Sequence, residues 1–160
     1  MPGQKPPITL YTDGAASGNP GPGGYGAVLK CGNLEKELSQ GFRLTTNNRM
    51  ELLAVIAGLE AIRWEKADVT VVSDSTYVVK ALNEGWLEKW KRTGFKKVKN
   101  TDLWMRFLEV KARHNVSFQW VKGHAGHPYN ERCDALAVAA YKSENLPEDT
   151  GYNVQEEKLI

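Results

Sequence analysis

The sequence predicts an α/β fold in which helices cover both faces of a five-stranded mixed sheet. Two observations predict this class. Three consecutive stretches of β-forming residues open the chain, and later apolar stretches alternate with segments of helical periodicity, giving the order βββαβαβα. Consecutive strands form an antiparallel meander, whereas strands alternating with helices add in parallel. The 160 residues suit a single domain, residues 1–160. Its core is expected over about residues 8–142, followed by a polar tail, residues 143–160, that frays.

The opening meander is expected to have three strands. The first covers residues 8–12, where β-formers alternate until the turn-forming Asp13. Residues 18–26 are rich in glycine and proline, and we expect a loop with special backbone angles there. The next two strands are expected over residues 25–31 and 35–42, joined by a hairpin turn.

The later elements alternate between helical and strand periodicity. Thr45 or Thr46 offers a cap for the first helix, and Thr101 with Asp102 offers one for the third. The expected elements are a helix over residues 47–62, a strand over 69–73, a helix over 75–83, a helix over 101–110, a strand over 116–120 and a helix from about 128.

Composition and charge exclude several classes of protein. No apolar run approaches the ~20 residues that span a bilayer, and the first residues lack a secretory signal, so we expect the cytoplasm. Cys31 and Cys133 lie far apart without metal-ligand spacing, which indicates reduced thiols. The net charge is only +2, yet residues 89–99 hold six basic side chains and no acid. The nearly neutral net charge of the whole chain hides such a local excess of positive charge.

Four acids are candidates for metal chemistry. Asp13 and Asp74 end two strands, Glu51 falls in the first turn of a helix, and Asp134 lies on the last helix. If the two strands are neighbours, both aspartates reach the edge where sites in α/β sheets open. Carboxylates that lie so near one another need a cation to stay ionised, and carboxylate oxygens favour Mg²⁺ or Mn²⁺ as the bound ion. Each acid alone also fits an ordinary role in a turn, a cap or a solvated helix, so their joint placement carries the argument.

Several blocks of sequence resemble type 1 ribonuclease H, in that family's order. They are residues 12–15 (Thr-Asp-Gly-Ala), 18–26, 46–52 (Thr-Asn-Asn-Arg-Met-Glu-Leu), 74–78 and 120–134. The resemblance covers about residues 8–141. It implies a ribonuclease H-like fold and a stand-alone endonuclease that hydrolyses the RNA strand of RNA–DNA hybrid duplexes. The implied products carry 5′-phosphate and 3′-hydroxyl ends.

The resemblance also implies a catalytic site. Two Mg²⁺ ions, with Mn²⁺ able to take their place, would be held by four carboxylates, those of Asp13, Glu51, Asp74 and Asp134. One ion would activate the attacking water and the other would stabilise the leaving oxygen. His124 lies in a glycine-flanked loop, which suits proton transfer or product release. His127 is expected to make structural hydrogen bonds, and His114 to lie on the surface.

Two sets of hybrid-binding residues follow from the same resemblance. The first lines the minor groove, where the 2′-hydroxyl marks RNA, and consists of Gly14, Ala15, Asn19, Asn47 and Asn48. The second grips the DNA strand and consists of Trp86, Trp90, Lys91 and Arg92, while Thr46 and Asn100 hold a DNA phosphate. The alternatives are helix capping by the two adjacent asparagines and a solvated basic helix with both tryptophans in the core.

Three other functions remain open on the sequence alone. A related nuclease, transposase or junction resolvase would share the fold. A hybrid-binding module without catalysis would lack one of the four acids, and all four are present. A detached domain of a reverse transcriptase is the third. We expect a monomer with no obligate protein partner and no membrane association.

Overall fold

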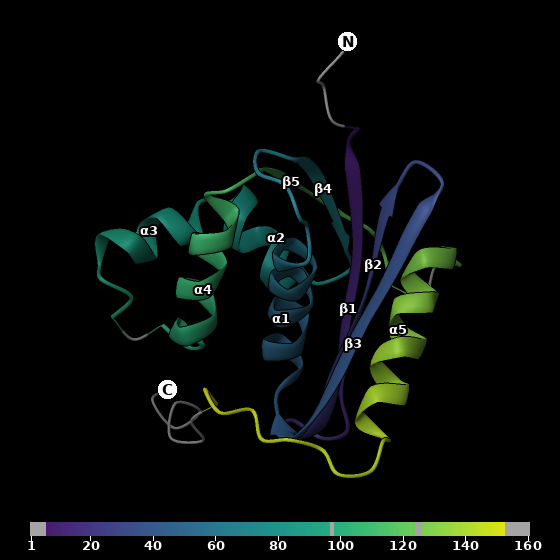
Figure 1. Cartoon of the computed structure of the whole chain (residues 1–160). Coiled ribbons are helices and arrows are strands. Elements are labelled where there is room, and N and C mark those ends of the chain that lie inside the picture. The colour runs from purple at the N-terminus through teal and green to yellow at the C-terminus, as the bar shows by residue number, and fades with distance from the viewer. Residues whose placement is uncertain (1–5, 97, 124–125, 153–160) are drawn as a thin grey trace.

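The computed structural model describes residues 6–96, 98–123 and 126–152, and it confirms the five-stranded mixed sheet with helices on both faces (Figure 1). The elements in chain order are β1 Ile8–Ala16, β2 Gly21–Cys31, β3 Leu34–Thr45, α1 Asn47–Glu60, β4 Asp68–Ser73, α2 Thr76–Asn83, α3 Trp86–Arg92, α4 Thr101–Lys111, β5 Asn115–Trp120 and α5 Pro128–Tyr141. Helix α3, in the basic segment, is an addition to the elements expected from periodicity. None of the described helices combines the length and the apolar content needed to cross a bilayer.

The strand order β3-β2-β1-β4-β5 makes β1 the junction between the two halves of the sheet. Strand β1 pairs antiparallel with β2 and parallel with β4. In the parallel pair, Thr12 lies opposite Ser73, so Asp13 and Asp74 follow at neighbouring positions. The expected end of the first strand is wrong, because β1 continues to Ala16 and Asp13 lies inside it.

Helices α1 and α5 cover opposite faces of the sheet (Figure 1). Helix α1 contacts β1 and β2, and α4 packs on its outer side. Trp104 and Phe107 of α4 are fully buried there, together with Met50 and Leu52 of α1. Because this layer holds most of the apolar core, α1 is fixed firmly against β1. The side chains of α1 therefore have defined positions relative to β1.

The glycine-rich segment forms a strand over much of its length, so the prediction of a loop over residues 18–26 is wrong from Gly21 onward. The glycines are needed for close packing of α5 on β2. A Cβ on Gly26 would lie 2.2 Å from the carbonyl oxygen of Cys133, and one on Gly24 would lie 2.7 Å from that of Ala137. A closely approaching backbone explains the strand glycines Gly24 and Gly26, whereas Gly18 has one of the expected special backbone angles, with a φ of +88°.

We expect Gly26→Ala to lower the free energy of unfolding by about 1–3 kcal/mol, the usual cost of overpacking. The added Cβ would meet backbone of α5, which can give way only if the helix moves. Urea unfolding measures the change. Gly32→Asn is the control, because the position is open to solvent and asparagine tolerates its φ of +61°. A Gly26 variant as stable as the wild type would contradict the close contact.

Two smaller expectations also fail. The predicted cap of the third helix is wrong, since α4 follows Asn100 without a side-chain cap and Asp102 pairs with Arg49 instead. His114 is buried rather than exposed, and its Nδ1 accepts a hydrogen bond of 3.1 Å from the backbone N–H of Ala67. This contact joins the turn after α4 to the start of β4.

The first part of the C-terminal tail is ordered against the body, in contrast to the expected fraying from residue 143. The backbone N–H of Arg43 donates to the carbonyl oxygen of Pro147 at 2.9 Å. Asp149 forms an ion pair with the buried Arg49, with Nε to Oδ2 at 2.7 Å. The rest of the predicted tail, residues 153–160, lies outside the described residues.

Candidate active site

Three carboxylates converge beside the sheet. Asp13, Glu51 and Asp74 each offer an oxygen, and these oxygens lie within 4.8 Å of one another. With Asp134 they line a cleft of about 410 Å³. The other predicted residues on its wall are Gly14, Ala15, Asn47 and Asn48. The structure therefore brings together acids from distant parts of the sequence and most of the expected minor-groove residues.

Gly14 lets α1 approach β1 closely enough to bring Glu51 beside Asp13. A Cβ on Gly14 would lie 2.4 Å from the backbone nitrogen of Glu51, so a side chain there would push the two elements apart. The N–H of Gly14 donates to Glu51 Oε1 at 3.0 Å and to Asp13 Oδ1 at 2.9 Å. Glu51 lies beyond the first turn of α1, which contains no acid, so the helix-dipole explanation for it is wrong.

Asp74 is held at the junction of β4 and α2. Ser75 caps α2, its Oγ accepting from the N–H of Val78 at 3.2 Å, so the pair Asp74-Ser75 does cap this helix, with Ser75 and not Asp74 as the capping side chain. The indole Nε1–H of Trp120 donates to the backbone oxygen of Asp74 at 3.1 Å. Gly123 lies so near that a Cβ on it would be 2.7 Å from Asp74 Oδ2. These contacts fix the backbone that carries the carboxylate.

Asp134 joins the cleft from the opposite layer of the fold. It lies on α5 next to Cys133, which packs over Gly26. Its carboxylate is outside the group of three, although it lines the same cleft. His127 caps α5 through Nδ1, which accepts from the N–H of Asn130 at 3.3 Å, as expected of a structural histidine. His124 lies outside the described residues.

The electrostatics of the cluster favour a bound cation. Burial, and then the charge of Asp74, raises the pKa of Asp13 to about 8. Burial, and then the charges of Asp13 and Asp74, raises the pKa of Glu51 well above its usual range. Glu51 Oε2 is buried without a hydrogen-bond partner among the described residues. Carboxylates so close ionise together only beside a positive charge, and a set of oxygen ligands suits Mg²⁺ or Mn²⁺. The residues present fit a divalent ion.

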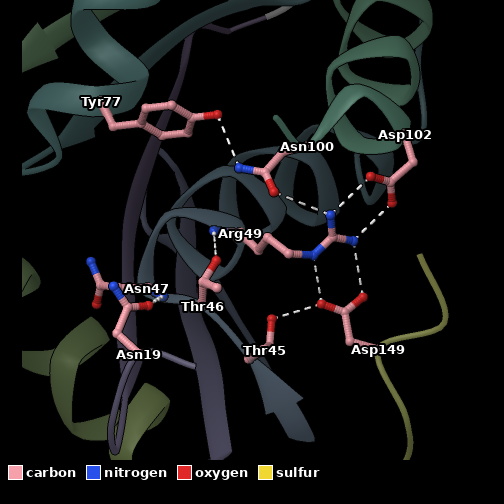
Figure 2. A network of polar contacts seen from close by, with 9 residues as sticks. All are labelled: Asn19, Thr45, Thr46, Asn47, Arg49, Tyr77, Asn100, Asp102 and Asp149. Carbon is pink, nitrogen blue, oxygen red and sulfur yellow. Dashed lines mark hydrogen bonds and ion pairs between the residues drawn. The ribbon is translucent and has the colours of Figure 1, made fainter. Parts of the chain in front are cut away.

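The start of α1 gathers the other expected groove residues. The side-chain oxygen of Asn19 accepts a hydrogen bond of 3.1 Å from the backbone N–H of Asn47 (Figure 2). Thr46 caps the helix, its Oγ accepting from the N–H of Arg49 at 3.2 Å. The loop that carries Asn19 is therefore joined to the first turn of α1, which lines the cleft of the acids through Asn47 and Asn48.

Helix α3 lies apart from the sheet (Figure 1). Its last turn holds three basic residues, Lys89, Lys91 and Arg92. Trp90 is half-buried and its ring packs 5.4 Å from that of Trp104, whereas Trp86 is 38% exposed. Lys91 and Arg92 are exposed to solvent. The alternative that places both tryptophans in the core is therefore correct for Trp90 and wrong for Trp86. Binding of the DNA strand by this helix stays a prediction.

Arg49 is an important residue that sequence reasoning missed. It is fully buried and forms ion pairs with Asp102 and Asp149. One indication was its place in the first turn of a helix, where the helix dipole disfavours a positive charge. Its carboxylate partners lie 53 and 100 residues away, so no local pattern could pair them with it.

Comparison with known proteins adds independent information. The family model described as RNase H matches residues 5–142. A ribonuclease H of Desulforamulus reducens is 60% identical over 147 residues, which cover 89% of this chain and 92% of that protein. A ribonuclease H of Nitratidesulfovibrio vulgaris strain DP4 is 53% identical over 150 residues, covering 91% and 96%.

The solved structures that resemble this chain include two ribonucleases H. LC9-RNase H1, described as a type 1 RNase H with the type 2 active-site motif, has a TM-score of 0.81 and 29% identity, covering 97% of this chain and 81% of that one. LC11-RNase H1, solved in complex with an RNA/DNA hybrid, has a TM-score of 0.62 and 27% identity, covering 84% and 96%.

Proposed function

Because this chain belongs to the ribonuclease H family, we propose that it hydrolyses the RNA strand of RNA–DNA hybrids with two metal ions, leaving 5′-phosphate and 3′-hydroxyl ends. The observation that carries the mechanism is the convergence of Asp13, Glu51 and Asp74 within 4.8 Å. Three buried or half-buried acids at one point have no evident use in stabilising the fold, since their charges repel.

The four carboxylates would have different places in the set of metal ligands. Asp13, Glu51 and Asp74 would form the central ligand set, with Asp134 completing it from the rim of the cleft. When bound, Mg²⁺ or Mn²⁺ supplies Lewis acidity to the attacking water and to the leaving oxygen. The N–H of Gly14 keeps Glu51 and Asp13 oriented toward each other. His124, the residue after Gly123 in the sequence, would accept and release a proton.

Recognition of the hybrid would be shared between two surfaces. Gly14, Ala15, Asn47 and Asn48 line the cleft with small and amide side chains, which suit a shallow groove with 2′-hydroxyls. Asn19 is held beside them. Helix α3 would follow the DNA strand with Lys91, Arg92 and the exposed Trp86. A hybrid bound to both surfaces would have its RNA strand at the acids.

A direct assay tests this function. The protein is incubated with end-labelled RNA–DNA hybrid, RNA duplex and DNA duplex, in Mg²⁺ or Mn²⁺ and with EDTA. We expect cleavage of RNA in the hybrid alone, its loss in EDTA, and product ends that a polynucleotide ligase or phosphatase identifies as 3′-hydroxyl and 5′-phosphate. Cleavage of the RNA duplex at a similar rate, or cleavage that persists in EDTA, would refute the proposal.

Trp86→Ala and Lys91→Ala should each raise KM for the hybrid roughly tenfold while changing kcat little, because α3 is separate from the acids. Steady-state kinetics measure both constants. Lys36→Ala, an exposed lysine on β3, is the matched control for lost surface charge. An unchanged KM in both α3 variants would exclude this helix as a binding surface.

The same proposal includes the enzyme's state in the cell. We propose a monomeric, single-domain enzyme of the cytoplasm that needs no protein partner. Its support is the single hydrophobic core that the described residues form between the sheet and its helices. Sedimentation at several protein concentrations tests the monomer, since a dimer would show a mass that rises with concentration.

A further inference from the structure

An ionic network around the buried Arg49 joins the C-terminal segment to the start of α1 (Figure 2). The Arg49 guanidinium forms paired hydrogen bonds with two carboxylates. Its Nε and Nη2 donate to Asp149 at 2.7 and 3.0 Å, and its Nη1 and Nη2 each donate to Asp102 at 2.8 Å. The C-terminal segment reaches this place by crossing from the end of α5 on one face of the sheet to the start of α1 on the other (Figure 1).

The network has one carboxylate more than charge balance needs. Arg49 uses all five of its N–H donors, the fifth contact being from Nη1 to Asn100 Oδ1 at 3.4 Å. Asp102 alone would neutralise the guanidinium. Asp149 adds a second negative charge, and its Oδ2 also accepts from the hydroxyl of Thr45 at 2.7 Å. The second carboxylate therefore fixes the direction of Arg49 and of the chain before α1.

Arg49 in turn holds the two residues that are expected to bind a DNA phosphate. Its backbone N–H donates to Thr46 Oγ, and its side chain donates to Asn100 Oδ1. The Nδ2 of Asn100 donates to the hydroxyl of Tyr77 at 3.1 Å, so the orientation of the amide is defined at both ends. Thr46 and Asn100 come from different elements, and Arg49 connects them directly.

We propose that Asp149 is a positioning residue for the hybrid. Through Arg49 it sets the relative placement of Thr46 and Asn100, and so determines how well this pair binds a phosphate of the DNA strand. This proposal rests on the proposed function. It makes the segment that follows α5 part of substrate binding, although that segment contributes no described side chain to the cleft of the acids.

The hydrolysis step itself should not depend on the contact between Asp149 and Arg49. Successive residues of an α-helix are rotated by about 100°, so Glu51 projects about 200° away from Arg49. The N–H of Gly14, outside the network, orients the carboxylate of Glu51. Loss of Asp149 should therefore weaken binding and leave the rate of the bound complex nearly unchanged.

The test compares Asp149→Ala and Asp149→Asn with Glu148→Ala, a matched control whose exposed carboxylate pairs with the exposed Arg43. Fluorescence anisotropy with a labelled hybrid in EDTA gives Kd over a range of salt, and steady-state assays in Mg²⁺ give KM and kcat. For Asp149→Ala we expect Kd and KM to rise roughly tenfold with kcat within about twofold. The slope of log affinity against log salt should stay unchanged, because Thr46 and Asn100 are uncharged and their contact with a phosphate releases no counterions.

A double-mutant cycle separates positioning from stability. If Asp149 acts through Asn100, the effects of Asp149→Ala and Asn100→Ala on Kd will not add. Asp149→Asn keeps the shape and should recover part of the affinity, and it carries the test if the alanine variant does not fold. A lowered Tm with unchanged Kd would overturn the proposal, as would additive effects. A wild type that neither binds nor cleaves hybrid would instead refute the proposed function.

Discussion

Asp13→Asn should reduce hydrolysis of the hybrid by roughly a thousandfold or more while the fold is kept. Metal ions contribute several kcal/mol to the stability of such a transition state, and each 1.4 kcal/mol is about a factor of ten in rate. Ligand oxygens of Asp13, Glu51 and Asp74 lie within 4.8 Å of one another, so the substitution removes one charged ligand from the centre of the set. The amide has the same shape as the carboxylate, and its neutral charge relieves repulsion from Asp74. Single-turnover rates in Mg²⁺ measure the loss.

The control for this variant is Asp68→Asn. Asp68 is an exposed aspartate on β4 whose Oδ1 accepts a hydrogen bond from Asn115 Nδ2 at 3.0 Å, so the same change of charge is made far from the cleft. Its activity should equal that of the wild type. A circular dichroism spectrum like that of the wild type, together with a higher Tm in EDTA, would show that Asp13→Asn loses activity without unfolding. Activity near the wild-type rate in Asp13→Asn would overturn the metal assignment.

The stability of the metal-free protein should fall steeply as pH rises from about 4 to about 8. The pKa of Asp13 is raised from 3.8 in the unfolded chain to about 8 in the fold, and the pKa of Glu51 is raised as well. Between these limits the folded state holds more protons than the unfolded state, so raising the pH favours unfolding. The contribution of Asp13 is fully present below about pH 4 and is lost by about pH 8. Each step of one in pH between these limits lowers the free energy of unfolding by on the order of 1.4 kcal/mol for one such group.

Urea unfolding in EDTA at a series of pH values measures this dependence. We expect the slope to flatten in Asp13→Asn, because one of the protonated groups is gone. Mg²⁺ should raise the Tm more at pH 8 than at pH 5, since a cation binds the ionised carboxylates and competes with protons for them. A free energy of unfolding that rises over this pH range in EDTA would show that the acids are not brought close in the metal-free protein.

Much of the fold could be predicted because local patterns determine it. Alternation in residues 8–12 and helical spacing in residues 47–62 each reflect which side of an element faces the core. The errors arose where packing between distant segments decides the structure. Gly24 lies in β2, where the close backbone of α5 requires a glycine, whereas a glycine-rich loop has the same local composition. Strand β1 passes through Asp13 because β2 continues to pair with it as far as Ala16.

The acids of the site could be predicted because strand ends and parallel pairing limit where they lie. Thr12 opposite Ser73 leaves the following aspartates beside each other. The Arg49 network could not be predicted, since an aspartate 100 residues away has no local pattern that links it to a helix start. The burial of His114 was missed for the same reason, because its partner is a backbone N–H 47 residues earlier.

The ionic network also has a consequence for biosynthesis. At about 5–20 residues per second, a ribosome needs roughly 5–20 s to add the 100 residues that separate Arg49 from Asp149. During that interval the guanidinium lacks the carboxylate that completes its set of acceptors. The nascent polypeptide can thus collapse around its sheet early, yet reaches its final arrangement only after Asp149 has been added.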